Sequence, residues 1–237
     1  MSIRQLKADL HTHTSEDPCD SMIAHSSVML IDEAARQGYE VLAITNHDSQ
    51  HYSTELFEYA MARGVLLIKG MELTYEGQHI VLLNFDDAGE IKGPDDIMRR
   101  KGDKNLVIAP HPYFMMSYHC RDLLDNRPEL FDAVEYAHLY TSFLNFNERA
   151  VKRAGELGLP LIGTSDAHTL VQMGHTYTLI EAEKTVESVV AAVKAGHVEL
   201  VTKPLSLFKF LGIIGLMKYW SMKRSIGELF SAQRYFR

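Results

Sequence analysis

Apolar residues follow two alternating patterns along the chain. Short continuous apolar runs predict buried strands, and longer segments with apolar residues every three to four positions predict helices. The expected strands cover residues 7–11, 40–47, 65–73, 79–85, 105–112, 132–138, 159–168 and 175–180. The expected helices cover residues 26–39, 53–64, 94–100, 145–158 and 185–196. This alternation predicts an α/β fold of about six or seven βα units, which can close a barrel or form a doubly wound sheet.

Residues 203–237 depart from this pattern. They contain seven Lys or Arg and one acid, so they contribute +6 to a total formal charge of −7, and residues 1–202 carry −13. Lys209 and Lys218 interrupt their apolar part, which is shorter than the ~20 apolar residues of a membrane-spanning helix. A basic amphipathic helix on a membrane surface is one interpretation. We favour a helical extension that packs on the domain formed by residues 1–202, or on a second subunit, because apolar helix faces are usually buried.

The composition is that of an ordered globular protein, with 46% hydrophobic and 23% charged residues. The negative net charge argues against a general attraction to nucleic acid. Cys19 and Cys120 form neither a CxxC motif nor a disulfide framework, and the N-terminus lacks the apolar segment of a signal peptide. These features predict a cytoplasmic protein.

Histidines and acids gather where the expected strands end. In extended chain, residues two positions apart point to the same side, so His11 and His13 can aim two nitrogens at one point. Similar positions, just past an apolar strand, are held by His47, Glu72, His111, His138, Asp166 and His168. In parallel α/β folds this edge carries the functional sites. His79 opens its strand instead, so it reaches the same edge only if that strand runs antiparallel or bends.

This set of donors suits Zn, Mn or Fe, because imidazole and carboxylate together are good ligands for these ions. It is too large for one ion, so we expect two or three divalent metal ions, with Glu72 suited to bridge two of them. The segment after His13 adds further acids. Asp20 is the expected ligand there because it adjoins the start of a helix, Asp17 is the alternative, and Cys19 is expected to be a bystander.

The ordered motifs DLHTHT, AITNHD, GMEL, QHIVLLN, APHP, GTSDAH and HTYTLIEA resemble the PHP family (polymerase and histidinol phosphatase domain) over about residues 7–200. The resemblance implies a distorted seven-stranded, TIM-like (β/α) barrel with a metal cluster, usually trinuclear, at the C-terminal rim. It also implies phosphoesterase activity. The ligands it implies are His11, His13, Asp20, His47, Glu72, His79, His111, Asp166 and His168.

The chain departs from the family pattern at several positions. Asn46 replaces an acid and could retune His47 through a hydrogen bond. The spacing from His13 to the expected Asp20 ligand is longer than usual. His175 replaces an arginine that could face an anionic substrate, and His138 stands where other residues are common. Both histidines are candidates to protonate the leaving group or bind phosphate, or they are hydrogen-bonding neighbours.

The sequence therefore predicts a phosphoesterase that hydrolyses a phosphate ester with metal-bound hydroxide, with Glu72, His138 and His175 as its candidate catalytic residues. The expected partner is a small phosphomonoester or a nucleotide. The acidic barrel argues against a long nucleic-acid track. Alternatives are a 5′-3′ exonuclease on short oligonucleotides, a catalytically silent scaffold stabilised by metal, and a peripheral membrane protein.

Overall fold

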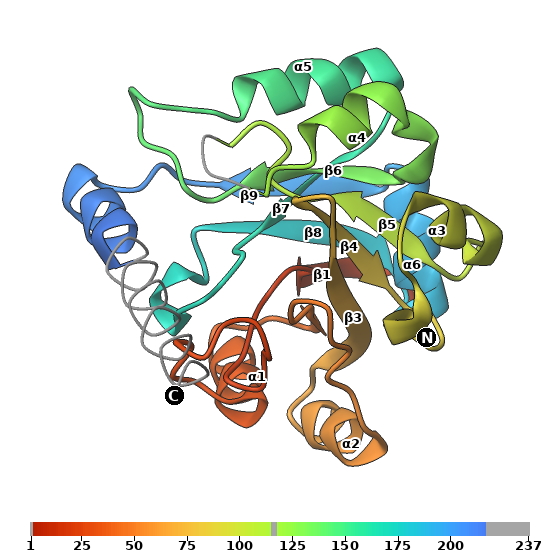
Figure 1. Ribbon diagram of the computed structural model, residues 1–237. Coiled ribbons are helices and arrows are strands. Elements are labelled where there is room, and N and C mark those ends of the chain that lie inside the picture. The colour runs from red at the N-terminus through yellow and green to blue at the C-terminus, as the bar shows by residue number, and fades with distance from the viewer. Residues whose placement is uncertain (1, 115–117, 217–237) are drawn as a thin grey trace, which may run out of the picture.

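Nine strands form one mixed sheet in the computed structural model, which describes residues 2–114 and 118–216 (Figure 1). In chain order the strands are β1 (Arg4–Asp9), β2 (Val41–Ile44), β3 (Leu66–Tyr75), β4 (Gln78–Leu83), β5 (Leu106–Ala109), β6 (Ala133–Ala137), β7 (Leu161–Thr164), β8 (Thr176–Ala182) and β9 (Val198–Thr202). Their order in the sheet is β7-β6-β5-β4-β3-β2-β1-β8-β9. The α-helices lie around the outside of the sheet and are α1 (Ser27–Arg36), α2 (Thr54–Ala62), α3 (Pro94–Arg100), α4 (Arg121–Asn126), α5 (Glu148–Leu157) and α6 (Val186–Lys194).

The expectation of seven strands is wrong. β1 pairs in parallel with β2, β2 with β3, β5 with β6 and β6 with β7, as βα units require. Four other pairings, β1/β8, β3/β4, β4/β5 and β8/β9, are antiparallel. The turn between β3 and β4 has positive φ at both Glu76 (49°) and Gly77 (72°), which is the two-residue geometry of a tight hairpin. The sequence reading also left out β9 and α4.

The sheet nearly closes on itself where β7 meets β8. Gly163 donates its N–H to Thr178 Oγ1 at 2.9 Å, and the same hydroxyl donates to the Gly163 carbonyl at 2.8 Å. A Cβ at this position would lie 2.5 Å from Leu200 Cδ1 and 2.8 Å from the Tyr177 carbonyl oxygen. The closing contact therefore requires glycine, and the fold is a nearly closed α/β barrel.

Gly163→Ala is expected to lower the free energy of unfolding by about 1–3 kcal/mol, because the added methyl must displace packed backbone and side-chain atoms. Gly155→Ala on α5 is the matched control, since a Cβ there would meet no heavy atom within 4 Å. In a helix interior the control should be neutral or stabilising. Urea unfolding of both variants makes the comparison, and equal midpoints would contradict the packing argument.

Local signals set several helix ends where the sequence predicts them. The side chains of Ser26, Ser53 and Thr185 accept from the backbone N–H three residues later at the starts of α1, α2 and α6. Gly158 ends α5 with a left-handed backbone. Inside the barrel, apolar side chains such as Leu6, Ile68 and Ile108 are fully or almost fully buried. The strands are therefore held rigidly enough to position the groups at their ends.

The C-terminal segment packs on the barrel as far as the structure describes it. Residues 207–216 are helical, and Phe210 and Ile213 bury against Leu139 in the loop after β6. Leu207, Phe208 and Leu211 of the same helix are exposed, and the choice between the packed extension and the membrane-surface helix stays a prediction. The rest of the expected extension, residues 217–237, lies outside the described residues, and the division at residue 202 stays a prediction. Among the helices that the structure describes, none is long and apolar enough to cross a membrane.

Candidate metal centre

The expected ligands converge at the edge of the barrel formed by the carboxyl ends of the parallel strands. His11 and His13 follow β1, His47 follows β2, and His111 follows β5. Asp166 and His168 follow β7. His79 lies on β4, which runs antiparallel to β3, so this strand delivers the side chain to the common edge. Glu72 lies within β3 rather than past its end, because pairing with β4 extends β3 to Tyr75.

The Glu72 carboxylate is the centre of the cluster. It is 1% exposed, and its two oxygens lie 2.9–3.3 Å from nitrogens of five imidazoles. These belong to His11, His13, His47, His79 and His111. Oε1 faces His11, His79 and His111, and Oε2 faces His13 and His47, so each oxygen meets its own set of nitrogen donors. A bridging carboxylate requires this placement.

A second carboxylate meets the opening histidine pair. The Nε2 atoms of His11 and His13 are 3.2 Å apart, and Asp166 Oδ1 lies 3.5 Å and 3.2 Å from them. Asp166 Oδ1 is buried and has no aligned hydrogen-bond partner among the described residues. An oxygen with these surroundings, beside two convergent nitrogens, fits a divalent cation, because Zn, Mn and Fe accept mixed nitrogen and oxygen ligands.

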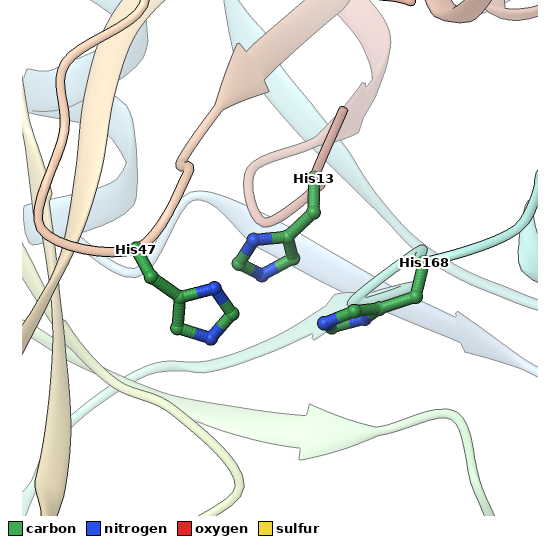
Figure 2. A group of neighbouring side chains, drawn as sticks. All are labelled: His13, His47 and His168. Atoms are coloured by element: carbon green, nitrogen blue, oxygen red, sulfur yellow. The ribbon is translucent and has the colours of Figure 1, made fainter. Parts of the chain in front are cut away.

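Three imidazoles form a further group, shown in Figure 2. His13, His47 and His168 come from three separate strand ends and point toward one another. The His13 ring lies 4.4 Å from the ring of His47 and 4.4 Å from that of His168. Asp20 Oδ2 is 3.8 Å from His168 Nε2, so Asp20 borders this group. The structure therefore brings all nine expected ligands to one region.

Asp17 contacts the far side of two of these rings. Its Oδ2 lies 3.2 Å from His13 Nδ1 and 2.7 Å from His47 Nδ1, and it accepts the His47 backbone N–H at 2.8 Å. Its Oδ1 accepts the backbone N–H groups of Cys19 and Asp20. Burial opposes its ionisation, but the hydrogen bonds from His13 and His47 hold the Asp17 pKa below its usual value. Because its oxygens are engaged in this way, Asp17 orients imidazoles, which favours Asp20 as the ligand.

Glu135 is a site residue that the sequence reading missed. It lies on β6, is fully buried, and its Oε2 is 2.8 Å from His11 Nδ1. This contact fixes the ring so that His11 Nε2 faces the cluster, as a carboxylate behind a ligating histidine does. The available signal was a single acid inside the apolar strand of residues 133–137. Acids are rarely buried without a polar or charged partner, so an acid at this position predicts such a contact.

Asn46 supports the loop that carries the first histidines. Its Oδ1 accepts the Thr14 backbone N–H at 2.9 Å, and its Nδ2 donates to Thr14 Oγ1 at 2.9 Å. The expected hydrogen bond from Asn46 to His47 is absent from the described contacts, and it is Asp17 that contacts the His47 ring. The replacement of an acid by Asn46 therefore acts on loop position.

Electrostatic interactions in the cluster favour ionised carboxylates and protonated imidazoles. Burial opposes ionisation of Glu72, yet His79, His11 and His47 hold its pKa well below the usual value. Burial also opposes protonation of His11, but Glu72, Asp166 and Glu135 raise its pKa well above the usual value. The metal-free cluster thus holds protons that a cation must displace.

Metal binding is expected to release protons and to weaken as the pH falls. Groups whose pKa is raised stay protonated through neutral pH, so each displaced proton lowers the apparent affinity about tenfold per pH unit in that range. Competition of the stripped protein with a zinc chelator at pH 6 and pH 8 measures this dependence. Equal affinities at the two values would contradict the assigned proton occupancy.

His138 and His175 stand apart from the ligand cluster. His138 is buried, its Nε2 lies 3.1 Å from Gln172 Nε2, and burial lowers its pKa to about 4. It is therefore neutral at pH 7, which favours a hydrogen-bonding role over proton donation. His175 contacts the Met173 carbonyl oxygen at 3.3 Å and Lys209 Nζ at 3.0 Å. The catalytic roles given to both histidines stay predictions.

The fold is a nearly closed α/β barrel, and imidazoles and carboxylates gather at its rim. This arrangement is consistent with the class of barrel proteins that bind metal ions. Known proteins with similar sequence or structure make the class more specific. A family model described as PHP-associated matches residues 145–198. An uncharacterized protein from Methanocaldococcus jannaschii is 31% identical over 147 residues, which cover 57% of this chain and 83% of that protein.

Solved structures share the fold. PsfC from Pseudomonas syringae superposes with a TM-score of 0.60 at 16% identity, covering 94% of this chain and 99% of that one. A candidate metal-dependent phosphoesterase from Bifidobacterium adolescentis gives a TM-score of 0.50 at 15% identity, covering 68% of this chain and 87% of that one. Residues 145–198 thus match a PHP-associated domain, and the chain shares the fold of these solved structures.

Proposed function

We propose that this protein is a metal-dependent phosphoesterase that hydrolyses a small phosphomonoester or a nucleotide, with two or three ions of Zn, Mn or Fe. The observation that carries the proposal is the Glu72 carboxylate, buried among five imidazole nitrogens at 2.9–3.3 Å. Burying a carboxylate and several imidazoles together costs free energy, and bound cations would offset that cost. The PHP-associated match over residues 145–198 and the motifs that resemble the PHP family support this class of chemistry.

Different groups of these residues would bind different metal ions. His11, His13 and Asp166 would offer donors to one ion, and His79 and His111 to another, with Glu72 in contact with both sets. Asp20, His47 and His168 would offer donors to a third. Divalent ions held by these residues would neutralise phosphate charge and lower the pKa of a bound water toward neutrality.

The chain's own residues fix the geometry of this set. Asp17 holds the rings of His13 and His47, and Glu135 holds that of His11, so the nitrogens that face the cluster are oriented before an ion arrives. Pre-set ligands reduce the rearrangement that binding and turnover require. The scaffold hypothesis is less favoured because every expected ligand is present.

The charge of the barrel favours a small substrate over a polynucleotide. Residues 1–202 carry a formal charge of −13, which repels a long phosphate backbone.

A screen for phosphate release tests the proposal. Protein loaded with Zn, Mn or Fe is offered phosphomonoesters, nucleotides and short oligonucleotides, and free phosphate is measured. Turnover of monoesters or nucleotides supports the proposal. Cleavage of oligonucleotides alone would support the exonuclease alternative, and metal-loaded protein with no turnover would support the scaffold.

A further inference from the structure

The helix over residues 207–216 borders the candidate metal centre. Ile213 and Leu216 line the same pocket as His168 and Asp20. Figure 1 shows this helix, in blue, on the same side of the barrel as the loop between β7 and β8. The chain enters the helix through Leu205, whose N–H donates to the Tyr140 carbonyl at 2.9 Å. The helix is therefore part of the wall of the cleft.

Lys209 lies on the face of this helix that borders the cleft. It precedes Ile213 by four residues, and side chains four apart on a helix are neighbours on one face. Its neighbour Phe210 is buried against the barrel, and Lys209 itself is half-buried. A cation is thus placed one helical turn from the pocket that His168 and Asp20 share with Ile213.

The Lys209 ammonium is held by a neutral group instead of by a carboxylate. Its Nζ donates to His175 Nε2 at 3.0 Å, while His175 Nδ1 donates to the Met173 carbonyl at 3.3 Å. This pair of contacts fixes the neutral tautomer, with hydrogen on Nδ1. Among the acids that the structure describes, none pairs with Lys209, and its ammonium has three N–H donors, of which His175 uses one.

His175 also lies within electrostatic reach of the cluster. The charges that act on the buried His138 include those of Asp166, His168, His175 and His11. The His175 carbonyl accepts the Lys203 N–H at 2.9 Å, which ties the start of the C-terminal segment to this loop. The charge of His175 thus acts on the same buried imidazole as the charges of Asp166 and His168.

We propose that Lys209, positioned by His175, binds an anionic oxygen of the substrate's phosphate group and makes the C-terminal helix part of the substrate site. This rests on the proposed phosphoesterase function. The ligand class is a phosphomonoester dianion, because an ammonium one helical turn from the pocket of His168 and Asp20 favours a compact double negative charge. Lys209 acts on binding, and His175 is a positioning residue.

Inorganic phosphate is the probe for this proposal, because its binding to the metal-loaded protein can be measured by calorimetry without turnover. Lys209→Met is expected to weaken phosphate binding about tenfold or more, the loss of one charge-assisted hydrogen bond. Lys209→Arg should recover part of that loss. His175→Ala should weaken binding by less, and the double variant should resemble Lys209→Met, because both side chains act through one contact.

Lys203→Met is the matched control, since this exposed lysine lies in the same segment and has the same charge. It should change phosphate affinity by less than about twofold. Metal content and melting temperature of all variants should equal those of the wild type. Equal losses in Lys203→Met and Lys209→Met, or no loss in either, would overturn the proposal. If the wild type hydrolyses no ester while the Lys209 effect persists, the phosphoesterase function fails and the anion site stands.

Discussion

Glu72→Gln is expected to reduce phosphate release by about 10³-fold or more, the largest effect of any single substitution in this protein. The change keeps the shape of the side chain and removes the charge that faces five imidazoles. The amide is a poor bridge between cations, so charge stabilisation of several kcal/mol is lost at the reacting centre. Initial rates of phosphate release at saturating metal measure the effect.

Glu76→Gln is the control for this variant. Glu76 lies four residues further along, in the exposed turn between β3 and β4, and the substitution removes the same charge outside the cluster. It should retain the wild-type rate within about twofold. Similar losses in the two variants would assign the effect to the hairpin and not to the carboxylate in the cluster.

Glu135→Gln is expected to lower metal affinity about 10–100-fold while the protein stays folded. The charge behind His11 Nδ1 is lost, so the ring becomes less basic and its orientation is less strongly held. Titration of the stripped protein with Zn or Mn, followed by chelator competition, gives the ratio of affinities.

Glu129→Gln serves as its matched control, because Glu129 is an exposed acid shortly before β6 that pairs with Arg127 at the surface. Its metal affinity should equal that of the wild type. An unchanged affinity in Glu135→Gln would show that the His11 contact does not tune the site.

Much of the rim could be predicted from the sequence, because strand ends are local features. The apolar runs before His47, His111 and Asp166 set these residues at the carboxyl ends of parallel strands, and the structure places them there. The direction of β4 is harder to predict from the sequence, since periodicity does not distinguish parallel from antiparallel strands. The Glu76–Gly77 turn was the local signal that reverses the chain.

The missed parts of the site depend on contacts between distant segments. Glu135 is 124 residues from His11, so only the folded chain shows that the two side chains meet. Asp17 was considered as a ligand because acids near histidines suggest metal binding, but its hydrogen bonds show which side of each ring it contacts. Lys209 meets His175 through the packing of the last described helix, which no motif reports.

The dependence of phosphate release on bound metal tests the central claim most directly. Protein stripped with a chelator is titrated with Mn or Zn, and phosphate release from an ester that the wild type hydrolyses is followed against metal equivalents per chain. We predict no release from the stripped protein and a rise that continues past one equivalent, because the described donors form more than one group that can hold an ion. Full activity in the stripped protein, or a loaded protein that releases no phosphate from any ester, would contradict the account.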